Sequence, residues 1–129
     1  MARFIFRKEQ RIRSEADFQR VMKHKRSVSK GFMRLYMAPN TAGRPRFGIS
    51  IGRTCGKAHI RNRLKRLGRE AFRLCQHEIP ADFDYVLIFT PKMSKTKAES
   101  DRDLKKVTFQ EIRDRFLEMI HLLAAGQKP

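Results

Sequence analysis

Cysteine is scarce and long apolar runs are missing in this sequence, and each shortage excludes a class of protein. The two cysteines, Cys55 and Cys75, are too few for a disulfide framework, so we expect free thiols in a reducing compartment. No run of about 18 apolar residues is present, and neither end carries a lipidation or secretory signal. The sequence therefore predicts a cytoplasmic protein that acts away from membranes.

Acidic residues are also in short supply. Only 13 Asp and Glu residues stand against 30 Lys and Arg residues, which gives a formal net charge of +17. Such an excess repels itself within a compact fold, and a bound polyanion relieves the repulsion. Because membrane signals are missing, RNA or DNA is the first partner to consider.

Apolar periodicity predicts three helices and three strands in the order α-β-β-α-β-α. The expected helices span about residues 14–26, 57–76 and 103–124, and the expected strands span about 31–37, 46–52 and 85–89. We expect one α+β domain over residues 1–129, a two-layer sandwich with a small mixed sheet and helices on one face. Residues 1–10 are expected to form a flexible basic tail, and residues 92–101 a mobile loop.

The helix expected over residues 57–76 is basic on one face and apolar on the other. At about 100° per residue its basic face carries Asn62, Arg66, Arg69 and Arg73, with Lys65 beside them. Like charges repeat there at i,i+3 and i,i+4, a spacing that costs stability unless an outside anion binds. We therefore expect phosphate binding by the basic residues of this region, which are Arg53, Lys57, Arg61, Arg63, Lys65, Arg66, Arg69 and Arg73. Asn62 is expected either to brace a turn or to contact RNA.

Three other kinds of site fit the sequence poorly. The segment from Gly52 to Lys57 fails as a P-loop, because its first glycine is misplaced and Ala58 stands where a metal-binding hydroxyl is needed. The cysteines and histidines near this helix match no common zinc spacing. No nucleophile–base pair stands out either, so we expect no catalytic residue and no protein-bound metal.

Three aromatic residues have two possible roles. Phe18 on the first helix, and Phe32 and Tyr36 on the first strand, are either core residues or the lining of a groove. In a groove they would stack on unpaired bases, the common way in which a sheet holds single-stranded RNA. In the second expected strand, the small residues Gly48 and Ser50 alternate with apolar ones and leave one face open to a close neighbour.

The motifs FGISIGR (residues 47–53), KAHIRNRLKR (57–66) and REAF (69–72) resemble the signature of the bacterial ribonuclease P protein component. The resemblance covers about residues 11–123. It implies the fold of a ribosomal-protein domain with a left-handed β-α-β crossover around the basic helix. It also implies a protein subunit that assists a catalytic RNA, with its magnesium ions, in removing the 5′ leader of precursor tRNA. A structural or ribosomal RNA-binding protein without processing activity is the alternative.

The resemblance further implies two binding surfaces. The basic helix, with Asn62 and the basic residues from Arg53 to Arg73, would bind the catalytic RNA. A cleft between the first helix and the sheet would hold the leader, lined by Arg11, Arg13, Phe18, Met22, Phe32, Arg34, Tyr36 and Ser50. Some family members carry a second aromatic residue where this chain has Met22.

Overall fold

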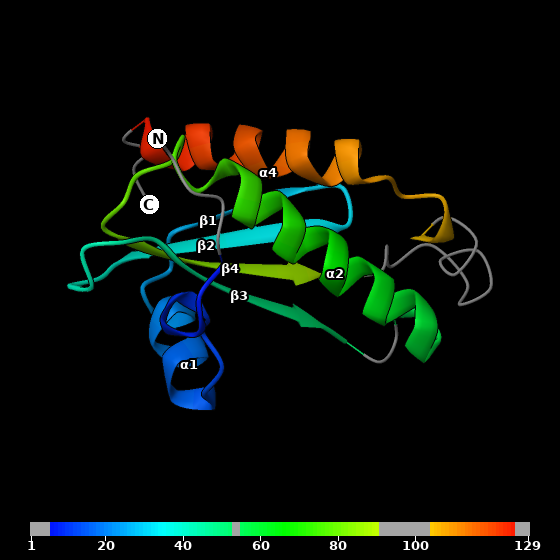
Figure 1. Ribbon diagram of the computed structural model, residues 1–129, viewed down its shortest axis with the longest axis horizontal. Helices are drawn as coiled ribbons and strands as arrows, with labels where there is room; N and C mark the ends of the chain where they lie inside the picture. Colours follow the sequence, from blue (N-terminus) through cyan, green and yellow to red (C-terminus); the bar gives the residue numbers. More distant parts are fainter. Residues whose placement is uncertain (1–5, 53–54, 91–103, 126–129) are drawn as a thin grey trace.

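The computed structural model describes residues 6–52, 55–90 and 104–125, and it confirms the α+β fold with a small mixed sheet (Figure 1). Its elements are η1 (Lys8–Gln10), α1 (Glu15–Lys23), β1 (Ser27–Lys30), β2 (Met33–Pro39), β3 (Arg46–Ile51), α2 (Ala58–Cys75), β4 (Phe83–Phe89) and α4 (Phe109–Ala124). No helix among the described residues is long and apolar enough to cross a membrane.

The sheet has four strands in the order β1-β2-β4-β3. The pairs β1–β2 and β2–β4 are antiparallel, whereas β3 and β4 are parallel and are joined by α2. Figure 1 shows α2 in front of the sheet, with β3 and β4 both running to the right and β4 above β3. This arrangement is a left-handed crossover, as the resemblance implies and against the usual right-handed rule.

One face of the sheet is covered by α2 and α4, and the main core lies between these layers. Phe47 of β3 stacks on Phe72 of α2 with ring centroids 4.9 Å apart, and Phe116 of α4 packs edge-on against Phe47. Gly68 lets α2 lie close to the sheet, because a Cβ at this position would stand 2.5 Å from Ile49 Cδ1. The core therefore holds the apolar stripe of α2 inward and leaves its polar face outward.

The opposite face of the sheet carries α1, which corrects the expectation that all helices share one face. The side chain of Val21 on α1 is fully buried in a small second cluster with Ile12, Ala38 and Val86. Ser14 caps the helix by accepting a hydrogen bond from the Asp17 backbone N–H at 3.1 Å. The sheet is thus sandwiched between unequal layers, two helices on one side and one short helix on the other.

Several features differ from those expected. A short first strand, β1, was missed at Ser27–Lys30. The last helix begins at Phe109, after Thr108, whose hydroxyl caps it by accepting from the Glu111 N–H, and not at residue 103. The part of the expected tail that is described is packed: the ring of Phe6 lies 5.2 Å from that of Phe72, and Gln10 is buried. The expected loop at 92–101 lies outside the described residues.

Candidate RNA interface

The outward face of α2 presents the predicted basic row. Asn62, Arg66 and Arg69 are exposed, and none of them forms an ion pair or side-chain hydrogen bond with another described residue in the structure. Arg73 differs, because its guanidinium pairs with Glu70 one turn earlier, with Nε donating to Oε2 at 2.9 Å. The surface on this face is therefore polar, cationic and available along most of the helix.

The residues at the start and flanks of α2 are more constrained. Lys57 is the N-cap residue and is exposed, whereas Arg61 donates from Nε to the Gly56 carbonyl at 3.1 Å. Arg63 and Lys65 are half-buried, and Nη1 of Arg63 is buried without a hydrogen-bond partner among the described residues. Arg53 lies outside the described residues. The structure thus separates the predicted set into an exposed row and partly buried flanks.

A second surface lies on the α1 face of the sheet. Strand register aligns Tyr36, Val86 and Gly48 in one row across the sheet, and Arg34, Ile88 and Ser50 in the next. Phe18 of α1 lies over the first row, because its Cζ would be 2.9 Å from a Cβ on Gly48. The second row lies beside the helix, with Arg34 and Ser50 exposed and Ile88 half-buried. These residues share one face of the sheet beside α1, and we call this surface the groove, after the cleft that the resemblance implies.

Five of the predicted cleft residues belong to this groove. Phe18 and Tyr36 pack on the same apolar cluster, and Met22 lies one helical turn after Phe18, half-buried. The guanidinium of Arg34 lies 5.9 Å from the centre of the Tyr36 ring and donates to the Ser27 hydroxyl at 3.0 Å. Ser50 completes the groove from β3. Half-buried aromatic rings beside a fixed cation are suited to stacking on bases.

Phe32 does not belong to the groove, so its predicted place there is wrong. It lies in the turn before β2, where strand alternation no longer sets its direction. Its ring packs 5.7 Å from that of Phe89 and under the guanidinium of Arg115 at 5.3 Å, on the side covered by α4. The sheet therefore separates Phe32 from Phe18 and Tyr36.

Arg11 and Arg13 lie between the two surfaces. Their segment runs beside β3, where the Ile12 N–H donates to the Phe47 carbonyl at 2.8 Å. A hollow of about 290 Å³ at this edge is lined by both arginines and by Arg69 of α2. Residues predicted for the two separate sites are therefore brought together at the β3 edge of the sheet.

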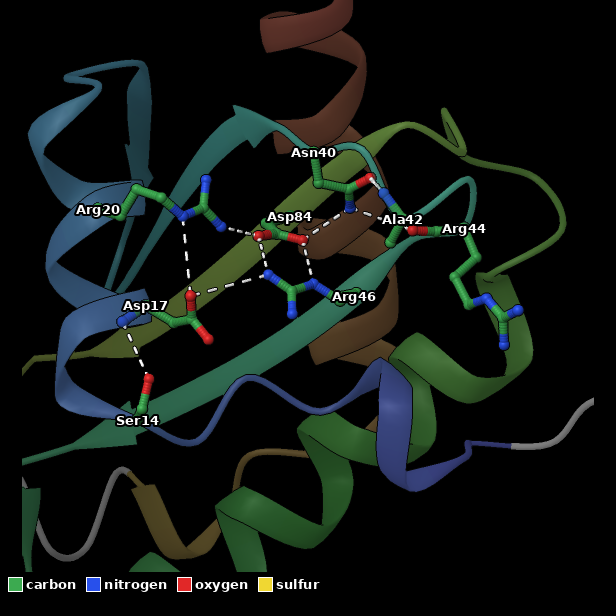
Figure 2. A network of polar contacts seen from close by, with 8 residues as sticks. All are labelled: Ser14, Asp17, Arg20, Asn40, Ala42, Arg44, Arg46 and Asp84. Carbon is green, nitrogen blue, oxygen red and sulfur yellow. Dashed lines mark hydrogen bonds and ion pairs between the residues drawn. The ribbon is translucent and has the colours of Figure 1, made fainter.

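The sequence reasoning missed a buried carboxylate, Asp84 (Figure 2). Its side chain is 0% exposed and accepts from Arg46 Nε at 2.8 Å, Arg46 Nη2 at 2.7 Å and Asn40 Nδ2 at 2.7 Å. Arg20 of α1 also donates to it. Burial raises the pKa of Asp84, but the hydrogen bonds from Arg46 and Asn40 and the nearby guanidinium charges outweigh it and hold this pKa below its ordinary value.

The cysteines and acids do not form a chemical site. Both cysteines are buried, and burial, together with the charge of Glu78, raises the pKa of Cys75 to about 11. The Cys55 thiol donates to the Phe89 carbonyl at 3.1 Å. Within residues 6–52, 55–90 and 104–125, no group of three His, Cys, Asp or Glu side chains could hold a metal ion.

Known proteins are similar to this chain in both sequence and fold. The family model for ribonuclease P matches residues 6–115. The ribonuclease P protein component of Dictyoglomus thermophilum is 33% identical over 121 residues, which is 92% of each chain. The RNase P protein from Thermotoga maritima superposes with a TM-score of 0.71 at 31% identity, covering 92% of this chain and 98% of that one.

A structure of the Staphylococcus aureus RNase P protein has a TM-score of 0.69 and is 27% identical, covering 88% of this chain and 94% of that one. These relatives favour an RNA-processing subunit over a structural or ribosomal RNA-binding protein. With its arginine row, its groove and its crossover in place, the chain belongs to the bacterial ribonuclease P protein family, the protein subunit of the ribonucleoprotein endonuclease that matures the 5′ end of tRNA.

Proposed function

We propose that the two surfaces bind two different RNAs. The exposed row of α2, with Asn62, Arg66 and Arg69, docks onto the catalytic RNA, and the groove beside α1 holds the single-stranded 5′ leader of precursor tRNA. Mg²⁺ held by the RNA subunit and the substrate would activate the water that hydrolyses the phosphodiester, in the cytoplasm. The protein neutralises phosphates so that the two polyanions approach each other.

The observation that carries this proposal is the separation of the two surfaces by the sheet. The α2 face is an arginine row without aromatic rings, as suits a duplex backbone read through its phosphates. The α1 face combines Phe18, Tyr36 and Arg34, as suits unpaired bases that stack on rings. Each surface therefore matches a different form of RNA.

Reconstitution tests the division of labour. Purified protein, a bacterial ribonuclease P RNA and precursor tRNA are combined at low magnesium, and leader removal is followed with and without each component. We expect cleavage by RNA and protein together, weak cleavage by RNA alone and none by protein alone. Leader removal by the protein without RNA would contradict the proposal.

A pair of variants tests the assignment of the surfaces. Arg66→Gln should weaken binding to the catalytic RNA and lower the slope of log affinity against log salt by about one unit. Phe18→Ala should spare this binding and weaken the affinity of the holoenzyme for precursor tRNA with a leader. Lys105→Gln, an exposed charge loss elsewhere, is the control. Equal effects of the two variants on both steps would rule out separate surfaces.

A further inference from the structure

The helix that forms one wall of the groove is weakly anchored by apolar contacts. Of the nine residues of α1, only Val21 is fully buried. The apolar cluster beneath it has four buried members, whereas the cluster under α2 and α4 has more than twenty. Packing alone therefore fixes the angle and height of α1 less firmly than it fixes the other helices.

Ion pairs supply the remaining anchor, and they converge on one buried group. Arg20 donates to Asp84, and Asp17 lies 3.8 Å from Arg20 Nε and 3.9 Å from Arg46 Nη2. Figure 2 shows the chain of contacts running from α1 through Asp84 to β3. We call these four residues, Asp17, Arg20, Arg46 and Asp84, the clamp. Every ion pair between α1 and the sheet that the described residues form belongs to it.

The clamp grips the flank of α1 that faces away from the groove. At about 100° per residue, Asp17 and Arg20 project to one side of Val21, and Phe18 and Met22 project to the other. A rotation or lift of α1 that loosens the clamp therefore moves Phe18 and Met22 relative to Tyr36. The clamp is also electrically neutral, because it holds two cations and two anions. We therefore expect its arginines to stabilise the placement of α1 and not to bind an RNA phosphate.

We propose that the clamp is a positioning device that sets the opening of the leader groove through the placement of α1. The inference rests on the proposed function of the groove. Arg20 is a positioning residue here, because it acts on the leader through Phe18 and not by contact. Removing its charge should loosen α1 while the Arg46–Asp84 pair, which joins β3 to β4, keeps the sheet intact.

A charge-matched pair of variants tests the proposal. Arg20→Gln and Lys23→Gln each remove one positive charge from α1, but exposed Lys23 takes no part in the clamp. The readout is the ratio of holoenzyme affinities for precursor tRNA with a long leader and with a single-nucleotide leader. We expect this ratio to fall about fivefold in Arg20→Gln and to change less than about twofold in Lys23→Gln. Affinity for the catalytic RNA should stay unchanged in both. Arg20→Lys should recover part of the ratio.

A second variant separates positioning from simple electrostatics by the sign of its effect. Asp84→Asn removes a negative charge, so electrostatics alone predicts tighter leader binding, whereas a loosened clamp predicts weaker binding. Only protein that retains wild-type affinity for the catalytic RNA is compared, and where Asp84→Asn does not fold the Arg20 pair decides. Equal ratios in Arg20→Gln and Lys23→Gln, or a raised ratio in folded Asp84→Asn, would overturn the proposal. If the wild-type holoenzyme bound precursor tRNA equally well with long and single-nucleotide leaders, the proposed binding of the leader in the groove would itself be contradicted.

Discussion

At the scale of single residues, the basic side chains that the structure describes differ in whether a partner within the fold holds them. Arg46 is tied into the sheet by Asp84, and hydrogen bonding to this carboxylate raises the pKa of Arg46. Arg66 and Arg69 form no such ion pair or side-chain hydrogen bond with another described residue. The exposed row of α2 could be predicted because it depends on local periodicity. The partners of Asp84 could not, because Arg46 is 38 residues away along the chain and Arg20 is 64.

Acid should weaken the fold through Asp84. Its pKa is lowered in the folded state, so its ionised form stabilises the fold above the ordinary carboxyl pKa, and this contribution is lost as the pH falls through the folded value. Asp84→Asn should lower the free energy of unfolding by about 3 kcal/mol at pH 7, because two guanidinium groups lose their anion. Its stability should then change less than that of the wild type between about pH 5 and pH 3. Urea unfolding across this range measures both effects, with exposed Asp82→Asn as the control. A parallel acid loss in wild type and Asp84→Asn would assign the titration to other carboxylates.

At the scale of elements, local pattern predicted what each segment forms but not always which side it packs on. The apolar stripe of the first helix is the same whether it lies above or below the sheet, and only the burial of Val21 with Ala38 and Val86 decides. Strand β1 has just four residues, and half-buried Ser27 and Val28 give no clear alternation. Phe32 fits the alternation of β2 in the sequence, yet it lies in the turn before the strand. These differences all arise from tertiary contacts that a local pattern does not contain.

Two glycines should respond differently to the same added methyl group. A Cβ on Gly48 would meet Ile12 Cβ at 2.9 Å and the Ile12 carbonyl at 3.0 Å, so backbone must move, and Gly48→Ala should cost about 1–3 kcal/mol. A Cβ on Gly68 would come close to the flexible end of the Ile49 side chain and would lie at an ordinary contact distance of 3.7 Å from Leu87 Cδ2. Alanine also favours the helix by about 1 kcal/mol. Gly68→Ala should therefore be nearly neutral. Thermal or urea unfolding compares the two, and equal losses would show that α2 cannot adjust over β3.

At the scale of the whole molecule, the net charge of +17 is distributed over surfaces of different chemistry. The arginine row of α2 and the aromatic groove beside α1 lie on opposite sides of a four-stranded sheet. Composition alone indicates a polyanion as partner. Expecting two RNA-binding surfaces required the resemblance to a family. Placing the residues expected for them required the fold, because Arg11, Arg13 and Arg69 meet only once β3 is paired.

The losses of binding free energy caused by one substitution at each surface should be additive. Residues separated by a sheet and sharing no partner couple weakly, so the free-energy losses of Arg66→Gln and Phe18→Ala in precursor-tRNA binding by the holoenzyme should sum to within about 0.5 kcal/mol in the double variant. Binding titrations of the wild type, both single variants and the double variant complete a double-mutant cycle and measure the coupling energy. A larger coupling would indicate that one RNA spans both surfaces through the hollow at the β3 edge.

The short segment beside β3 also protects the molecule from its own copies. β3 is an edge strand, and an unpaired edge is a template on which another chain can add a strand. Here the bridge between Arg11 and Phe47 occupies one position of that edge and places arginines beside it. Two such edges that approach each other meet an occupied position at Phe47 and like charges beside it, so the addition of a strand at this part of β3 is disfavoured even when no RNA is bound.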